Sequence, residues 1–391
     1  YTILRHELHG LPEQISDSKL TQVVNYNGYG ESDVVTNTVN NKRTYDYGLS
    51  YNLMGQITGK TETLADGSEN TFVYGYDDKR RLTSVTKNNV QVESYDYDAN
   101  GNRKLKSSVW SGITDQIATF NIADQQQTDG STQFEYDANG RLSKKLSPIN
   151  GGTAIEEYRY SSQGRLQGVV FKELVATTSI ETTIKTITYK HNALGNRVAK
   201  LVDGEVTEKY LWLNKTTLLA TYDQNDNLKQ RFEYGISHTP ISFTQAGSKY
   251  YITSDHLGSP RVITDESGNV IKAIEYDSFG NVVNDSNTTF EIPFGFAGGL
   301  QDADTQLLRF GYRDYDPKIG RWTARDPIGF AGGDTNLYGY VANDPVNWVD
   351  LNGLKGWFTG WSYKNGVISK GGVSFNHKTK TWIYKGDGVK I

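Results

Sequence analysis

The chain has 391 residues and a formal net charge of −4, which is too small to indicate a nucleic-acid or membrane partner for most of its length. It contains no cysteine, which excludes disulfides and thiolate metal sites, and no run of apolar residues long enough to span a membrane. Hydrophobic residues make up only 36% of the chain, but its 26 tyrosines and 40 glycines are typical of broad β-sheets with many turns rather than of disorder.

The chain begins YTILRHELHG, without an initiator methionine or a signal-peptide pattern. We therefore expect that it starts inside a longer protein and that any targeting information lies in the preceding part. His6 and His9 stand three residues apart in this segment, and His256 follows much later. None has a partner at ligand spacing, so the sequence predicts no metal site and no cofactor.

One short phrase recurs along the chain: an aromatic residue, Asp or Asn, two variable residues, Gly, then Arg or Asn and an aliphatic residue. Such internal repeats indicate an array of similar hairpins. Asp or Asn opens the turn because its side chain bonds to the backbone two residues on, and Gly takes the position with positive φ. The copies lie at residues 51–55, 97–103, 136–142, 160–166, 191–198 and 276–282, with degenerate copies at 76–82 and 222–228.

The segments between these turns alternate and are rich in Thr, Val, Ile and Tyr, as in TTIKTITY at residues 182–189, which predicts strands. We expect the tyrosine before each turn to contact the neighbouring repeat, and we find no amphipathic helix before residue 320. Such hairpins form either a solid solenoid or propeller, or a continuous sheet wound into a shell. The low aliphatic content favours the shell.

From residue 251 the repeat pattern gives way to other motifs. DHLGSPR occupies residues 255–261, RDYDPKIGRW residues 313–322, DPIG residues 326–329 and NLYGYVANDP residues 336–345. With these motifs the chain resembles the Rhs/YD-repeat family and its Rhs-associated core domain, over about residues 20 to 354. The resemblance implies an all-β fold of YD-repeat hairpins wound into a large hollow sheet, the cocoon, closed by a core plug. We expect the shell in residues 1–250, the core in 251–354, and a variable tail or the start of a toxin in 355–391.

Members of this family are toxin carriers, either effectors of type VI secretion in bacterial competition or C components of insecticidal toxin complexes. Related shells in adhesion proteins are not cleaved. The implied partners are the chain's own C-terminal toxin segment, an N-terminal shell portion, a secretion spike or toxin-complex subunit, and an immunity protein. The resemblance implies a secreted or delivered protein.

Many members cut themselves after a motif Asp-Pro-x-Gly-Leu. Here the matching residues are Asp350, Leu351, Asn352, Gly353 and Leu354, with Leu351 in the place of the proline. The implied scissile bond joins Leu354 to Lys355. The second aspartate of the family matches Asp326, and Asp326 and Asp350 resemble the paired carboxylates of an aspartic protease. Arg325 is an auxiliary residue that either pairs with one carboxylate or stabilises the turn.

Two close carboxylates suit amide hydrolysis, because one keeps its proton and acts as the acid while the other activates water. Both residues also have a structural interpretation: Asp326 before Pro327 opens a turn, and Asp350 forms an Asx turn with Gly353. We interpret Asp314, Asp316, Asp334 and Asp344 as turn residues, and we expect Trp322 and Trp348 to anchor the plug in the shell.

The tail from Lys355 is rich in lysine and predicts strands at 366–368, 372–375 and 381–384, with no catalytic motif. It is either the start of a longer toxin or a degenerate remnant, and its charge permits a nucleic-acid substrate for a missing toxin domain. Two further hypotheses stay open. One is a shell that is not cleaved, used in adhesion or as a structural module. The other is a carbohydrate-binding surface protein, supported by exposed aromatic residues.

Overall fold

The computed structural model describes residues 1–7 and 10–354 in full, and the backbone of short strands between residues 357 and 384. His9 and Lys355 therefore lie outside the described residues. The fold is all-β, as predicted, and 27 strands form one antiparallel sheet. In the described part of the chain no helix has the length and apolar character needed to cross a membrane.

The strands of this sheet are short and follow one another at turns of a few residues. They are β1 (Thr2–Arg5), β2 (Pro12–Ser16), β3 (Leu20–Tyr26), β4 (Ser32–Val39), β5 (Lys42–Arg43), β6 (Tyr45–Tyr51), β7 (Ile57–Leu64), β8 (Glu69–Tyr76), β9 (Leu82–Lys87), β10 (Val90–Tyr97), β11 (Arg103–Ser108), β12 (Ile113–Phe120), β13 (Gln126–Asp129), β14 (Thr132–Tyr136), β15 (Leu142–Ile149), β16 (Gly152–Tyr160), β17 (Leu166–Val175), β18 (Ile180–His191), β19 (Arg197–Val202), β20 (Glu205–Trp212), β21 (Leu218–Tyr222), β22 (Leu228–Tyr234), β23 (Pro240–Gln245), β24 (Ser248–Ser254), β25 (Pro260–Asp265), β26 (Val270–Tyr276) and β27 (Val282–Asp285).

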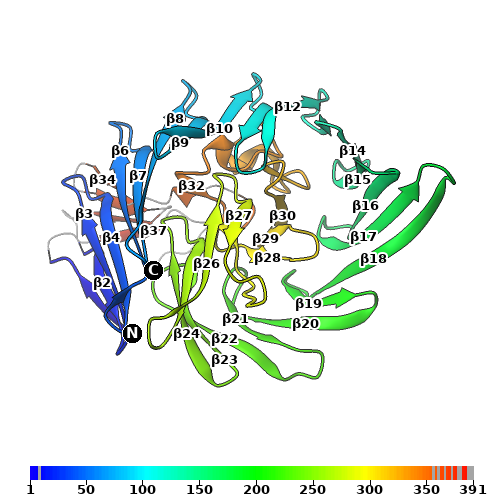
Figure 1. Ribbon diagram of the computed structural model, residues 1–391. Helices are drawn as coiled ribbons and strands as arrows, with labels where there is room; N and C mark the ends of the chain where they lie inside the picture. Colours follow the sequence, from blue (N-terminus) through cyan, green and yellow to red (C-terminus); the bar gives the residue numbers. More distant parts are fainter. Residues whose placement is uncertain are drawn as a thin grey trace.

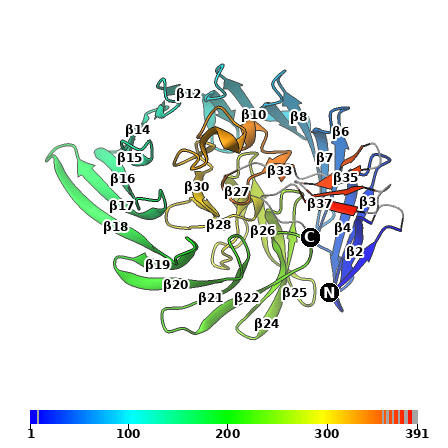
Figure 2. The same cartoon turned by 180° about the vertical axis from the view of Figure 1, so that it is seen from behind.

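Each strand pairs with the next one in the chain, except that β4 pairs with both the short β5 and β6. The sheet curls so that β2 to β7 come to lie beside β24 to β26 (Figures 1 and 2). Side chains join these two parts: Lys42 Nζ donates to Asn269 Oδ1 at 2.9 Å, and Arg261 Nη2 donates to Glu62 Oε2 at 3.1 Å. The sheet, called the wall below, thus forms a ring.

The YD turns have the predicted chemistry. In the copy at residues 136–142, Asp137 Oδ1 accepts hydrogen bonds from the backbone N–H of Asn139 and of Arg141, both at 2.9 Å, and Gly140 has a φ of 73°. In the degenerate copies Arg80 and Asp226 take this position with φ of 68° and 64°. The acidic opener therefore defines the turn even where glycine is missing.

The tyrosine before a turn contacts the neighbouring repeat, as predicted, and does so by a hydrogen bond. Tyr76 donates to the carbonyl of Ile57 at 2.6 Å, Tyr97 to that of Leu82 at 2.6 Å, and Tyr234 to that of Leu218 at 2.7 Å. In each case the acceptor lies at the first residue of a strand in the preceding hairpin. Consecutive repeats are thus tied together through the tyrosine hydroxyl as well as through the sheet.

Residues 286–354, called the plug below, lie inside the curve of the wall (orange and yellow in Figure 1). The sheet runs on to Asp285, well past residue 250, where the sequence suggested the end of the shell. The plug contains η1 (Phe296–Gly298), β28 (Leu300–Gln301), β29 (Leu308–Phe310), β30 (Arg313–Asp316), β31 (Arg321–Trp322), η2 (Gly329–Gly332), η3 (Val341–Asn343) and β32 (Trp348–Val349).

Separate hydrophobic clusters attach the plug to different arcs of the wall. Leu307 and Ile319 pack into the cluster of β14 to β18, while Phe294 and Leu300 pack into that of β20 to β25. Trp322 is buried in the plug's own aromatic core. Trp348 is 38% exposed and lines a cavity, so neither of the two tryptophans expected to anchor the plug belongs to the clusters that join it to the wall.

Beyond the plug, β33 (Trp357–Phe358) pairs antiparallel with β32. The remaining strands, β34 (Ser362–Lys364), β35 (Val367–Lys370), β36 (Val373–Asn376) and β37 (Thr381–Tyr384), form a separate antiparallel sheet. β35 to β37 overlap the three strands predicted for the tail.

Candidate functional site

Asp326 and Asp350 lie together, joined by an arginine that the sequence analysis did not select. Arg313 Nη2 lies 2.8 Å from Asp326 Oδ2 and 3.3 Å from Asp350 Oδ2. All three side chains are buried, with exposed fractions of 5% for Arg313, 7% for Asp326 and 3% for Asp350. The predicted pair therefore exists, and one buried guanidinium holds it.

Each carboxylate divides its two oxygens between a turn and Arg313. Asp326 Oδ1 accepts from the N–H of Ile328 at 2.9 Å, which is the expected turn before Pro327. Asp350 Oδ1 accepts from the N–H of Leu354 at 3.0 Å. The structural and the catalytic interpretations of these aspartates are therefore compatible, because the turn fixes each side chain by one oxygen and leaves the other facing Arg313.

The predicted cleavage motif lies against this pair. Gly353 has a φ of 70°, and its carbonyl accepts a hydrogen bond from Arg313 Nε at 2.5 Å. A Cβ on Gly332 would lie 2.9 Å from both Asp326 Oδ2 and the carbonyl oxygen of Leu354. The carbonyl of the predicted scissile bond and the Asp326 carboxylate thus flank the same small space, which glycine leaves open.

A cavity of about 360 Å³ borders the pair. The plug contributes Arg313, Asp326, Asp350 and Leu354, and the wall contributes residues from the turns after β6 and β8, among them Met54 and Lys79. Its volume is ample for water, whose share of liquid volume is about 30 Å³. Leu351, in the place of the family's proline, packs against the aromatic core of the plug.

The surroundings of Asp326 favour its protonated form over its charged form. Burial raises the pKa of Asp326, and the nearby Asp350 adds to the rise, while Arg313 opposes it. Burial also lowers the pKa of Arg313. Asp326 is thus the carboxyl whose proton is retained more easily than in water.

Arg325 is placed away from both carboxylates. Its Nη2 donates to the carbonyl of Asn139 at 2.8 Å, in the YD turn after β14. Of the two roles predicted for Arg325, pairing with a carboxylate is wrong and support of a turn is closer to what it does. Arg313 stands in the RDYDP motif, so the sequence drew attention to this segment. It did not show that the antiparallel hairpin of β29 and β30 places the arginine at Asp350.

Two of the four other aspartates make the predicted turn bond, since Asp316 Oδ1 accepts from the N–H of Lys318 at 3.0 Å and Asp334 Oδ1 from that of Asn336 at 2.9 Å. Asp314 is paired with Arg197 and Arg309, and Asp316 with Lys145. Asp344 accepts from Gln56 at 3.2 Å. His256 donates from Nε2 to the carbonyl of Val346 at 2.9 Å. Among the described residues no group of acids and histidines is arranged to hold a metal ion.

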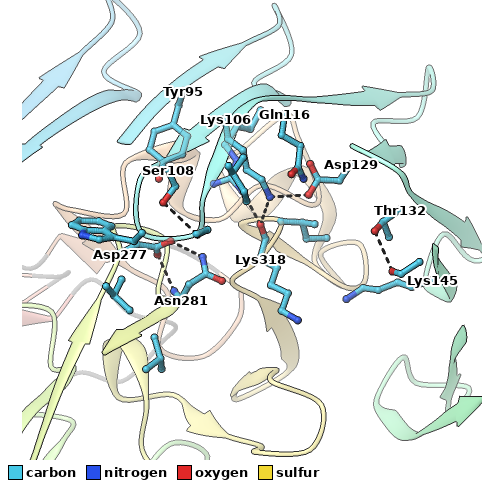
Figure 3. Close-up of a pocket in the computed structure, with 18 of the residues that line it drawn as sticks. Tyr95, Lys106, Ser108, Gln116, Asp129, Thr132, Lys145, Asp277, Asn281 and Lys318 are labelled. Carbon is cyan, nitrogen blue, oxygen red and sulfur yellow. Dashed lines mark hydrogen bonds and ion pairs between the residues drawn. The ribbon is translucent and has the colours of Figure 1, made fainter. Parts of the chain in front are cut away.

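A second cavity, of about 500 Å³, lies between the wall strands β10 to β16 and the plug (Figure 3). Lys106 Nζ donates to Asp129 at 2.8 Å and to the carbonyl of Lys318 at 2.9 Å, so the wall binds the plug here through its lysine. Asp277 borders the same cavity and lies close to buried Glu93. Burial, with Asp277 adding to it, raises the pKa of Glu93 to about 8.

Comparison with known proteins agrees with this architecture. Residues 3–346 match the family model described as teneurin YD-shell. Mouse teneurin-3 is 26% identical over 343 residues, which cover 85% of this chain and 12% of that protein. WapA of Bacillus spizizenii, named a tRNA3(Ser)-specific nuclease, is 28% identical over 288 residues, which cover 72% of this chain and 12% of WapA.

Among solved structures, TcdB2-TccC3-TEV superposes with a TM-score of 0.58 at 18% identity, covering 90% of this chain and 19% of that one. This likeness concerns the fold. The chain spans about an eighth of the length of the curated relatives named above. The resemblance to Rhs/YD-repeat proteins is confirmed, and the chain belongs to the teneurin YD-shell family.

Proposed function

We propose that this chain is the closing part of an Rhs-type toxin carrier, which encloses its C-terminal cargo and cuts itself once after Leu354. The observation that carries the proposal is the buried Asp326–Arg313–Asp350 bridge beside the Leu354 carbonyl. The bridge lies at the junction between plug and tail, which is where the proposed cut falls.

In this proposal Asp326 is the acid. Its pKa is raised by burial, and its Oδ2 and the carbonyl oxygen of Leu354 border the same space at Gly332, so we assign to it the proton that this carbonyl oxygen receives as water adds. Asp350 accepts from Arg313 and from the N–H of Leu354, contacts that orient its carboxylate to act as the base that takes a proton from cavity water. It then gives this proton to the nitrogen of Lys355 as the C–N bond breaks, while Asp326 takes its own proton back.

The substrate is part of the same chain, so binding costs no loss of translational freedom. Effective positioning of this kind can supply about 7–11 kcal/mol of the barrier. Arg313 supports it by holding the Gly353 carbonyl, and packing of Leu351 takes over the role of a proline in fixing the backbone before the cut. The reaction needs no cofactor and occurs once per molecule.

The cargo would be the segment that starts at Lys355, carried by a secreted or delivered shell with the N-terminal part, spike or toxin-complex subunit and immunity protein as partners. Since WapA is named a nuclease, a nucleic acid is one candidate substrate for such cargo. The competing function is a shell that is not cleaved, as in adhesion. Similarity to teneurins and Leu351 in place of proline favour that alternative.

Denaturing mass analysis of the purified protein separates the two. A toxin carrier yields a fragment that begins at Lys355, while a protein that stays at 43.7 kDa after prolonged incubation rejects self-cleavage. Limited proteolysis then tests enclosure. Cargo inside the shell is protected until the wall is unfolded, whereas a tail outside the shell is digested first. A glycan array tests the carbohydrate-binding hypothesis.

A further inference from the structure

Five basic side chains gather where three successive turns of the wall meet plug strand β29. They come from the turn after β16, the two ends of the turn between β18 and β19, the turn after β20, and β29 itself (Figure 1). We call them the cationic cluster: Arg165, His191, Arg197, Lys215 and Arg309.

Acidic partners are scarce here. Asp314 is the one carboxylate among the described residues that forms an ion pair with the cluster, at 2.9 Å from Arg197 Nη2 and 2.6 Å from Arg309 Nη1. Asp302 also acts on Arg197, but it is itself paired with Lys200 at 2.9 Å. The cluster thus holds more positive than negative charge in a place where water screens it poorly.

Several donors of the cluster have no hydrogen-bond partner in the structure. They are Nε and Nη2 of Arg309 and Nε of Arg197, and the ring nitrogen Nε2 of His191 also has no partner there. Arg309 is 5% exposed and Arg197 3% exposed, so both guanidinium groups are largely shielded from bulk solvent. Buried guanidinium donors without acceptors are rare, because leaving them unpaired costs free energy. Stacking of Arg197 on Tyr189, at 3.5 Å from the ring centroid, offsets only part of this cost.

Burial and the positive charge of the cluster lower the pKa values of two of its members, His191 and Lys215. Burial, together with Arg309 and Arg197, lowers the pKa of His191 to about 3. Burial, together with Arg309 and Arg165, lowers the pKa of Lys215 to about 8. Beside them a cavity of about 440 Å³ is lined by Arg165, Tyr189 and His191. An anion entering this cavity would meet a positive field from both the wall and the plug.

We propose that the cationic cluster is a binding site for a multivalent oxyanion, of which inorganic phosphate is the simplest example. Phosphate offers several acceptor oxygens and matches the paired N–H groups of guanidinium. In the cavity it would contact Arg165 and His191, which line it, and the charge of Arg197 and Arg309 behind them would add to its attraction. This site is separate from Asp326 and Asp350, so the inference stands whether or not the chain is cleaved.

The test is a titration of the intact protein with phosphate at constant ionic strength, with chloride as the comparison. We expect phosphate to raise the melting temperature while chloride does not, and to raise the pKa of His191, followed by NMR, because a bound anion favours the imidazolium. Arg165→Gln should weaken phosphate binding roughly tenfold or more, and Lys215→Gln should weaken it as well. Both positions are only half-buried, so these variants are expected to fold.

The matched control is Arg159→Gln, which removes the same charge from an exposed position on neighbouring β16 and should leave phosphate binding unchanged. Equal responses to phosphate and chloride would overturn the proposal, as would a His191 titration that phosphate does not move. Loss of binding in Arg159→Gln to the same extent as in Arg165→Gln would mean unspecific charge screening, and would overturn it too.

Discussion

Asp326 and Asp350, which are 24 positions apart in the sequence, face the same nitrogen of Arg313 at 2.8 and 3.3 Å. Two carboxylates this close repel each other when both are charged, and a cation between them reduces that repulsion. Arg313 therefore sets how readily the pair ionises, and this affects any chemistry the pair performs.

Replacing either aspartate should stop cleavage. Asp326→Asn and Asp350→Asn keep an oxygen for the turn hydrogen bond but remove the carboxyl that exchanges a proton. We expect the rate to fall by roughly 10² to 10⁴-fold in each, measured as the fraction of chain cut after Leu354. Asp223→Asn, in an exposed YD turn, is the control and should cleave normally. Normal cleavage in Asp326→Asn would exclude the proposed acid.

Arg313→Met should change the pH dependence of cleavage. Arg313 opposes the rise in the pKa of Asp326, so without it that pKa is higher and Asp326 stays protonated to higher pH. The pH above which cleavage declines should therefore move upward, and Arg313→Lys, which keeps the charge, should move it less. Arg325→Gln is the control, since its guanidinium bonds to Asn139. A shift in Arg325→Gln but not in Arg313→Met would contradict this assignment.

Gly332→Ala should slow cleavage without unfolding the plug. Its methyl group would lie 2.9 Å from both Asp326 Oδ2 and the Leu354 carbonyl oxygen, so it would push these two groups apart. Displacements of this size at a reacting centre cost rate even when the fold is kept. Gly28→Ala meets nothing within 4 Å and serves as the control in the same assay. Cleavage of Gly332→Ala at the normal rate would show that the reaction does not require Asp326 Oδ2 and the Leu354 carbonyl oxygen to come close together.

The sequence predicted the hairpin array well because its turn chemistry is local. An Asp or Asn opener and a residue with positive φ determine the turn wherever they occur, and Asp137 and Gly140 behave as expected. Which arginine pairs with Asp326 and Asp350 does not depend on neighbouring residues in the sequence. Arg325 is adjacent to Asp326 in sequence, but consecutive residues in extended backbone point their side chains in opposite directions. Only the fold of β29 and β30 shows which arginine reaches the pair.

The cationic cluster was missed for a related reason. Arg165 and Arg197 occupy the arginine position of ordinary YD phrases, where other copies place arginines with different partners. Arg81 pairs with Asp77 of its own turn at 2.6 Å, and buried Arg103 donates to the Lys318 carbonyl of the plug at 3.2 Å. What distinguishes Arg197 is its burial against Arg309 of the plug. Such contacts depend on how the wall closes around the plug, which single repeats do not encode.

The buried pair Glu93 and Asp277 should make stability fall as the pH rises. The pKa of Glu93 is raised from its ordinary 4.5 to about 8, so the folded state holds a proton that the unfolded state releases. This stabilisation is complete below about pH 4.5 and is lost as the pH rises through about 8, at up to roughly 1.4 kcal/mol per pH unit. Glu93→Gln should flatten the profile in this window, measured by urea unfolding, whereas Glu135→Gln, at an exposed position, should not.

Gly140→Ala should loosen the plug from the wall. Gly140 has a φ of 73°, and a Cβ there would lie 2.4 Å from Arg325 Nε and 2.7 Å from the Tyr338 hydroxyl. Both plug side chains bond to this turn, Arg325 to the Asn139 carbonyl at 2.8 Å and Tyr338 to the Gly140 carbonyl at 2.7 Å. The new methyl group therefore costs these hydrogen bonds as well as the strain of about 1 kcal/mol expected for a side chain at positive φ.

Gly151→Ala separates the two effects. Gly151 has a φ of 81° but meets nothing within 4 Å, so its substitution adds backbone strain alone. We expect Gly140→Ala to lower the free energy of unfolding by roughly 2–3 kcal/mol more than Gly151→Ala, since two hydrogen bonds at about 1 kcal/mol each are disturbed in addition. Limited proteolysis should also cut the plug near Arg325 earlier in Gly140→Ala. Equal losses in the two variants would mean that this turn does not hold the plug, and that the hydrophobic clusters around Leu307 and Phe294 hold it instead.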